Sequence, residues 1–326
     1  MTNKYLKQIV FGLLLFCLSL PAALVAEEKI SSERKKALSL FKKGVYWYEK
    51  GNIDKAFKIF QNAVEADRTY ADAYFNLAVI HAKRSEREKA IAAYEKVIEH
   101  DPNDAMAYNN FGNLLEEAGK DDVAEEKYRK ALEILPQFSL AASNLGNILY
   151  KKGKFQESVA WFEKSVTYSN GAPFAYSNLG NSYYQLGEFD KAIDQYNKAL
   201  DRNPGLAYIW VNQGYAYLGK KNFDFAAIAF EKALEKDRKN SQAYNGLGDL
   251  HALKKEVEPA LENYKKALVL SPQSPTIYYK MGLVLKEKDP KEAVKTFNEF
   301  LKRSENPERK KDVEKLVSEI ELNDVE

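Results

Sequence analysis

Asparagine side chains recur at one fixed interval through the middle of this chain. The series consists of Asn76, Asn110, Asn144, Asn178 and Asn212. A shorter series lies three positions further on and consists of Asn113, Asn147 and Asn181. An asparagine amide has an acceptor oxygen and two N–H donors, so it complements the hydrogen-bonding groups of a peptide unit. Because asparagine is a poor helix former, its regular recurrence inside predicted helices needs a reason.

These amides have two possible uses. A row of them can hold an extended chain by its backbone, largely regardless of that chain's sequence. Alternatively, the amides bond within the protein and join neighbouring helices, because buried amides usually find protein partners. The two uses are compatible if one amide group serves each role.

Catalytic and metal-binding residues do not form a recognisable constellation. The sequence contains no glycine-rich phosphate loop with its lysine, no HExxH pair and no nucleophile elbow. No two of the histidines His81, His100 and His251 have metal-ligand spacing. We therefore expect a protein that is not an enzyme and that has no catalytic residues, no metal site and no cofactor.

The charge balance argues against a nucleic-acid partner. The chain has a formal net charge of +2, and Lys4 and Lys7 are the only charged residues within positions 1–26. The remaining chain is therefore neutral, with charges of both signs mixed along it. A surface of this kind lacks the basic footprint of a nucleic-acid-binding protein.

Three further columns of residues share the period of the asparagines and predict the elements that position them. Aromatic residues stand at Phe60, Tyr94, Tyr128, Phe162, Tyr196, Phe230 and Tyr264, with Phe297 one residue early. Small residues stand four positions before each ring. Glycine or alanine stands 16 positions before most rings, at Gly44, Ala78, Gly112, Gly146, Gly180, Gly214 and Gly248, with Gly282 after them. Glycine inside a helix costs roughly 1 kcal/mol relative to alanine, so this column indicates a neighbouring helix that lies too close for a larger side chain.

The combined columns resemble the tetratricopeptide repeat (TPR) family, whose period of about 34 residues they share. The resemblance covers eight repeats, at residues 37–70, 71–104, 105–138, 139–172, 173–206, 207–240, 241–274 and 275–306. It implies an all-α fold, a right-handed α-solenoid superhelix of eight helix pairs whose first helices line a concave groove. Residues 27–36 are expected to form a short linker. Residues 307–326 are expected to form a capping helix and tail, with Val313, Leu316, Val317 and Ile320 at helical spacing.

The first asparagine series is similar to the asparagine ladder in the TPR superhelix of O-GlcNAc transferase, whose side chains contact the main chain of the target. That resemblance implies a protein-binding groove, whereas nothing in the chain resembles that enzyme's catalytic half. Both asparagine series are therefore assigned to the groove. Apolar residues at the second position of the central repeats could extend it as a stripe, or could contact only the neighbouring helix: Met106, Leu140, Phe174 and Tyr208.

Residues 1–26 are predicted to be a secretory signal peptide. Two lysines precede an apolar run from Ile9 to Leu20, and small residues follow Pro21 up to Ala26. The alternative is an uncleaved anchor, because residues 9–26 are just long enough to span a bilayer. Both alternatives place the repeats across the membrane, in the periplasm or outside the cell. Cys17 lies within the apolar run and lacks the small preceding residue of a lipoprotein signal.

We therefore expect an exported scaffold or adaptor that holds an extended segment of a partner protein in its groove, in cell-envelope assembly or secretion. The expected partners are one or more proteins or extended peptide segments, without nucleic acid. Contact with a membrane is expected only through an uncleaved N-terminal segment. The alternative is a structural or self-associating component of a larger envelope complex that uses its convex faces.

Overall fold

A computed structural model describes residues 30–323, and within that range every regular element is an α-helix. There are 17 helices in this part of the chain, which confirms the predicted all-α class of paired helices. In order they are α2 (Ser32–Glu49), α3 (Ile53–Ala66), α4 (Ala71–Lys83), α5 (Arg87–His100), α6 (Ala105–Glu117), α7 (Asp121–Ile134), α8 (Ser139–Lys151), α9 (Phe155–Tyr168), α10 (Pro173–Gln185), α11 (Phe189–Arg202), α12 (Ala207–Gly219), α13 (Phe223–Lys236), α14 (Ser241–Leu253), α15 (Val257–Leu270), α16 (Pro275–Leu285), α17 (Pro290–Arg303) and α18 (Pro307–Asn323).

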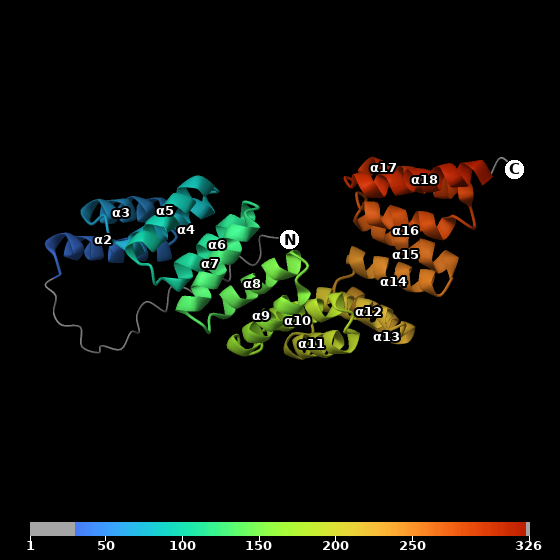
Figure 1. Cartoon of the computed structure of the whole chain (residues 1–326), viewed down its shortest axis with the longest axis horizontal. Helices are drawn as coiled ribbons and strands as arrows, with labels where there is room; N and C mark the ends of the chain where they lie inside the picture. The colour runs from blue at the N-terminus through green and yellow to red at the C-terminus, as the bar shows by residue number, and fades with distance from the viewer. Residues whose placement is uncertain (1–29, 324–326) are drawn as a thin grey trace. The chain divides into compact units, whose positions relative to one another are not determined.

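The helices belong to two compact units. The first contains α2–α5 and ends at Asn103, and the second contains α6–α18. In the second unit the helix pairs follow one another in chain order (Figure 1), and each pair packs on the next. The first helices of successive pairs also contact each other, from α6 through α8, α10, α12 and α14 to α16. They therefore form one continuous layer, and we call its exposed surface the helix-A face.

Glycine and ring packing explains why the two helices of each pair lie so close. A Cβ atom added to Gly146 in α8 would lie 2.7 Å from the nearest ring atom of Phe162 in α9. At Gly214 the corresponding distance to Phe230 is 2.6 Å. Both rings are almost completely buried. The predicted packing reason for the glycine column is thus confirmed: the neighbour that excludes a side chain is the aromatic ring of the same repeat.

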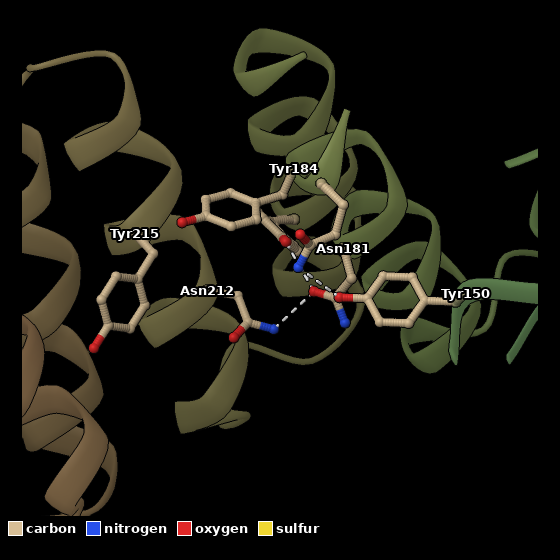
Figure 2. Close-up of a pocket in the computed structure, with 7 residues that line it drawn as sticks. Tyr150, Asn181, Tyr184, Asn212 and Tyr215 are labelled. Atoms are coloured by element: carbon tan, nitrogen blue, oxygen red, sulfur yellow. Dashed lines mark hydrogen bonds between the residues drawn. The ribbon is translucent and has the colours of Figure 1, made fainter. Parts of the chain in front are cut away.

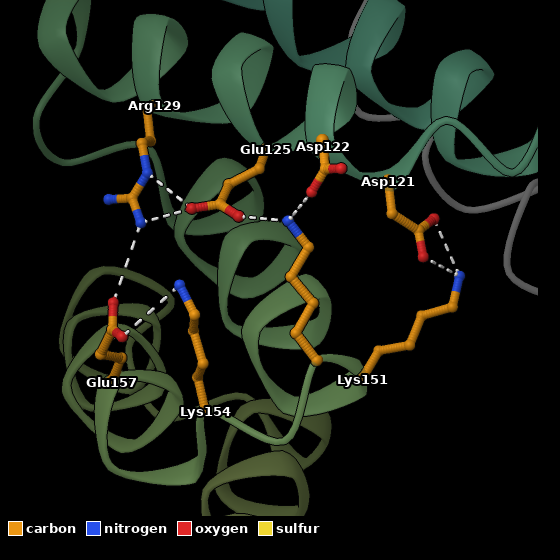
Figure 3. Close-up of polar contacts among 8 residues, drawn as sticks. Asp121, Asp122, Glu125, Arg129, Lys151, Lys154 and Glu157 are labelled. Atoms are coloured by element: carbon orange, nitrogen blue, oxygen red, sulfur yellow. Dashed lines mark hydrogen bonds and ion pairs between the residues drawn. The ribbon is translucent and has the colours of Figure 1, made fainter.

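Ion pairs connect neighbouring repeats beside the turns. Lys152, the C-cap residue of α8, places its Nζ atom 2.6 Å from Asp122 and 2.6 Å from Glu125 of α7 (Figure 3). Arg129 contacts the same Glu125 at 2.6 Å. Pairs at the same sequence separation as Lys152 and Asp122 are Arg84–Asp54, Lys151–Asp121, Lys220–Asp190 and Lys288–Glu258. Most of these side chains are exposed, so each pair contributes little to stability on its own.

The two ends of the described chain have defined caps. Helix α2 begins at Ser32, where the Ser31 hydroxyl accepts a hydrogen bond from the Arg34 amide at 3.1 Å. The predicted linker was therefore too long, because residues 32–36 are helical; the cause is this serine cap upstream of the repeat pattern. At the other end, Asn306 caps α18, and Val313, Val317 and Ile320 are buried in one cluster with Phe297 and Phe300 of α17.

The predicted signal peptide or anchor, residues 1–26, lies outside the described residues. Between residues 30 and 323, no helix combines the length and the apolar character that a membrane span requires.

Candidate functional site

The two asparagine series occupy the sixth and ninth positions of the first helices. All their members except Asn76, which belongs to the first unit, lie on the helix-A face. Between neighbouring repeats, the sixth-position amide nitrogen donates to the ninth-position oxygen of the preceding repeat. The Asn144 Nδ2 atom lies 2.8 Å from Asn113 Oδ1. The corresponding distances are 3.3 Å for Asn178 to Asn147 and 3.0 Å for Asn212 to Asn181. These three pairs, which we call the amide ladder, join α6 to α8, α8 to α10 and α10 to α12.

Two of the ladder oxygens also accept a hydrogen bond from a buried tyrosine. The Tyr128 hydroxyl donates to Asn113 Oδ1 at 2.8 Å, and the Tyr196 hydroxyl donates to Asn181 Oδ1 at 2.8 Å. Burial raises the pKa of both phenols far above its ordinary value, so both stay protonated and can donate. Asn147 receives no such bond because its repeat has Phe162 in the aromatic column. The oxygens of Asn113 and Asn181 thus have two donors each within hydrogen-bond distance, and the single Tyr128 hydroxyl proton is shared between Asn113 and Glu116, whose Oε2 atom lies at 3.0 Å.

Each ladder asparagine uses only its amide nitrogen or only its amide oxygen in these bonds, and the other polar atom has no partner among the described residues. In the part of the chain that the structure describes, the oxygens of Asn144, Asn178 and Asn212 accept no hydrogen bond. The nitrogens of Asn113, Asn147 and Asn181 likewise donate none there. Asn147 is exposed and the other five are half-buried, so all six groups can be reached from solvent. The helix-A face therefore presents a row of hydrogen-bond acceptors and an adjacent row of donors that have no partner within the described chain.

Two members of the first series differ from the ladder. The Asn76 amide, in the first unit, donates to the Asp72 carbonyl of its own helix at 2.9 Å. The Asn110 oxygen accepts from the neighbouring Asn109 at 3.2 Å. Asn109 is buried and also accepts from Asn144 at 3.0 Å, so it supports the ladder from the fifth position. Sequence reasoning missed Asn109 because its column does not continue as asparagine in the next repeats.

The ladder stops at α14, where Gly246 occupies the sixth position. One repeat further, Lys280 of α16 takes the place of the asparagine and donates to Asp249 of α14 at 2.6 Å. Asp249 stands at the ninth position and also accepts from the Tyr264 hydroxyl at 2.8 Å. We call this pair the charged step, because it joins neighbouring first helices at the same two positions as the ladder.

A pocket of about 350 Å³ lies on the helix-A face of α8, α10 and α12 (Figure 2). Two ladder residues contribute to it, together with tyrosines at the twelfth position of two repeats. The Tyr150 hydroxyl accepts from the Gln185 side chain at 2.9 Å. The complete lining is Tyr150, Asn181, Tyr184, Gln185, Tyr196, Asn212 and Tyr215.

The structure brings only part of the predicted site together at this pocket. Asn181 and Asn212 line it, whereas the second-position residues Met106, Leu140, Phe174 and Tyr208 do not. All four are half-buried, and Tyr208 packs against the buried cluster around Tyr196. The pocket tyrosines were missed, although Tyr48, Tyr150 and Tyr184 share one column and provided a signal. Binding by any of these residues stays a prediction.

No group of three or more potential metal ligands occurs among residues 30–323. The helix pairs and α18 account for nearly all of that range, and no catalytic domain is evident within it.

The helix pairs agree with comparisons to known structures. The chain matches a chain of the APC/C hetero-tetramer Cut9–Hcn1 with a TM-score of 0.60 at 18% identity, over 89% of this chain and 57% of that one. It matches the C-terminal part of a TPR repeat-containing protein from Cytophaga hutchinsonii with a TM-score of 0.58 at 18% identity, over 74% and 99% of the two chains. YrrB, described as a TPR protein with an unusual peptide-binding site, matches at 27% identity with a TM-score of 0.47, over 55% and 93%. At these levels the first two matches establish the fold alone. The comparison with curated proteins found no match.

Family models identify the repeats directly. Models described as tetratricopeptide repeat match residues 71–104, 93–126, 173–206, 207–240 and 277–306. A model described as TPR repeat matches residues 146–187 and 252–289. Together these segments cover more than half of the chain, and the segments 71–104, 173–206 and 207–240 each contain one helix pair of the structure. The chain therefore belongs to the tetratricopeptide repeat family, whose members are scaffolds that bind proteins and peptides.

Proposed function

We propose that this protein is a binding scaffold that holds an extended segment of a partner protein along the amide ladder. The proposal depends on the observation that each ladder amide uses one of its two polar atoms within the protein and leaves the other without a partner among residues 30–323. One end of each amide joins two repeats, and the other end faces solvent without a partner in the described chain. Groups that are accessible and unused within the protein can exchange their bonds with water for bonds with a bound chain.

The chemistry of the unfilled groups favours a peptide backbone. An extended chain that is not paired in a sheet carries an unsatisfied N–H donor and C=O acceptor on each residue other than proline. The ladder offers the complementary acceptors and donors from Asn144, Asn178 and Asn212 and from Asn113, Asn147 and Asn181. Because the ladder amides are neutral, they do not select the charge of the partner. We expect binding that depends on an extended conformation more than on sequence.

The charged step suggests a variant that separates binding from architecture. Changing Asn147→Asp and Asn178→Lys together creates an Asp–Lys pair at the same sequence separation as Asp249 and Lys280. The link between α8 and α10 is kept, but the outward donor and acceptor of that rung are lost. Peptides selected from a random phage-displayed library on the immobilised chain then serve as the probes. We expect them to bind this variant roughly 10-fold or more weakly, with little change in melting temperature.

The matched control places the same charges on the second helices of the same two repeats, as Gln156→Asp with Gln195→Lys. This control should bind the selected peptides like the unmodified chain. If the ladder variant binds them equally well, the amides serve only architecture and the proposal is wrong.

A second candidate function, self-association or lateral packing in a larger complex, is favoured by a patch on α13. Phe225 and Ile228 are 52% and 47% exposed, and Tyr217 stacks on Phe225 with ring centroids 5.3 Å apart. If this patch mediates assembly, Phe225→Glu should convert an oligomer to a monomer in analytical ultracentrifugation while peptide binding is retained. A monomeric unmodified chain would contradict this candidate.

We also propose that the chain is exported and acts in the cell envelope, on the basis of the order of basic, apolar and small residues in 1–26. Mass spectrometry of the native protein should find an N-terminus near Glu27 in a periplasmic or extracellular fraction. An intact N-terminus on a membrane-bound protein would instead establish the anchor.

A further inference from the structure

The pocket between Tyr150 and Tyr215 has walls that are fixed before any ligand binds. The Tyr150 ring meets Phe155 edge-on with centroids 5.3 Å apart, and the Tyr184 ring meets Phe189 in the same way at 5.5 Å. Tyr215 packs edge-on against the buried Phe230 ring at 5.3 Å, and its hydroxyl accepts from Asn245 at 2.7 Å. Each of these three tyrosine rings is thus held in position by a residue that does not line the pocket. A site of this kind loses little side-chain entropy when it is filled.

The lining contains aromatic and neutral polar groups and no formally charged side chain. Burial raises the pKa of the Tyr184 and Tyr215 phenols, and the nearby Asp249 carboxylate raises both further. Both phenols therefore stay neutral at physiological pH. An anionic side chain entering this pocket would lose hydration without gaining a counter-charge from the lining, and the Asp249 carboxylate nearby would repel it.

Several hydrogen-bonding groups of the lining remain unfilled. Within residues 30–323, the Tyr184 hydroxyl makes no hydrogen bond, and neither do Asn181 Nδ2 and Asn212 Oδ1. Asn181 Oδ1 accepts hydrogen bonds from both Asn212 Nδ2 and the Tyr196 hydroxyl (Figure 2). These bonds leave Asn181 Nδ2 and Asn212 Oδ1 at the opposite ends of the two amides. An aliphatic side chain in the pocket would cover these groups and leave them unsatisfied, which costs about 1–3 kcal/mol for each buried group.

We propose that this pocket receives a tyrosine or tryptophan side chain of the bound segment. Such a side chain is neutral, presents a flat apolar body to the rings of Tyr150 and Tyr184, and carries a polar tip for the unfilled groups. The volume of about 350 Å³ accommodates one large aromatic side chain. This inference rests on the proposed function, since Asn181 and Asn212 belong to both the ladder and the pocket.

The experiment uses the peptides selected from the random library on the full chain. We expect them to share a tyrosine or tryptophan at one position, and replacing it with leucine should weaken binding roughly 10-fold. In the protein, Tyr184→Phe removes one unpartnered hydroxyl without disturbing the fold. It should weaken a tyrosine-containing peptide roughly 2- to 10-fold and should leave the phenylalanine version of that peptide nearly unaffected.

Tyr183→Phe is the matched control, because its hydroxyl donates to Glu163 at 2.9 Å and does not line the pocket. This control should bind every selected peptide as the unmodified chain does. Selected peptides that prefer an aliphatic or charged residue would overturn the aromatic proposal and leave the ladder proposal standing. The same holds for peptides that tolerate leucine or do not distinguish Tyr184→Phe from the control. A library that yields no peptide at all would overturn both.

Discussion

The amide ladder and the charged step join neighbouring first helices in two different ways at equivalent positions. In the ladder, Asn178 donates to Asn147, and in the charged step Lys280 donates to Asp249 across the same sequence separation. The charged step uses nearly all its hydrogen-bonding capacity within the protein, because Asp249 receives Tyr264 and Lys280 also reaches Asn245 at 3.3 Å. The ladder uses half of its capacity.

This difference shows that asparagine is not required to join the repeats. An ion pair does the same work at the C-terminal end of the helix-A face, with side chains that are only 17% and 27% exposed. Neutral amides have a different advantage, since they connect the helices and still present hydrogen-bonding groups without charge to solvent. The ladder region is therefore suited to a ligand, and the charged step is suited to stability.

Asp249→Ala should have the largest effect on stability. It removes the carboxylate that accepts from Lys280 and Tyr264, and it leaves the half-buried Lys280 ammonium without its partner. We expect a loss of about 2–3 kcal/mol, below the range for a fully buried pair because both side chains retain some exposure. Urea unfolding of the full chain measures this loss. A change below that of a ladder variant would show that the charged step is not the stronger link.

Asn144→Ala should cost less, about 1 kcal/mol, because the variant removes one donor group and alanine favours the helix, which offsets part of the loss. The lost bonds are those to Asn113 and Asn109. Asn113 keeps the Tyr128 hydroxyl as a donor, which limits the cost further. The same urea experiment should also show unchanged stability for Gln156→Ala, a surface control on the next helix. A loss as large as that of Asp249→Ala would remove the distinction between the two kinds of link.

Glu116→Gln should be stabilising at neutral pH. Glu116 occupies the twelfth position beside the ladder, and its burial raises its pKa, despite the hydrogen bond from Tyr128. A carboxyl group whose pKa is higher in the folded than in the unfolded state destabilises the folded state once the pH rises above its unfolded-state pKa. It has no such effect at a pH where it is protonated in both states. The urea midpoint of the variant should therefore be higher at pH 7 and should approach that of the unmodified chain near pH 3. An advantage that persists at pH 3 would point to another cause.

The smallest expected effect on stability comes from protonating exposed acidic side chains near the charged step. The hydrogen bond with His251, and then that with Lys254, lowers the pKa of Glu256, and Lys288 lowers that of Glu258. A lowered folded-state pKa gives a stabilisation that is present above the unfolded value, near 4.5, and is lost as the pH falls through the folded value. Hydrogen exchange, corrected for intrinsic rates, should show α14 and α15 losing protection below this pH before α10 and α12. Equal loss in both regions would contradict this prediction.

The fold could be predicted from the sequence because its determinants are local and repeated. The constant spacing between glycines such as Gly146 and rings such as Phe162 already required a close helix pair, and the structure confirms that contact. The start of α2 is set by a single serine cap at Ser31, which precedes the repeat pattern and can be predicted only from the residue type. Caps depend on a few atoms at one position and leave no periodic signal.

The candidate site was only partly predictable. The asparagine columns identified the helix-A face, but which amide atoms remain free depends on helix spacing, which sets the contact between Asn144 and Asn113. The pocket depends on Tyr215 replacing asparagine at the ninth position of α12, beside tyrosines from two earlier repeats. That juxtaposition across repeats becomes visible only when the helices are placed in three dimensions.

The ladder's repetition has a consequence for how a bound segment finds its place. Three nearly identical rungs, one for each pair of neighbouring helices from α6 to α12, offer a backbone several equivalent registers that differ by one repeat. Three registers favour association by about 0.6 kcal/mol through multiplicity alone, but they leave the segment free to slide. The tyrosine pocket occurs at only one place along these rungs. A segment with one suitable side chain would be locked in register there, while its remaining residues stay free to vary.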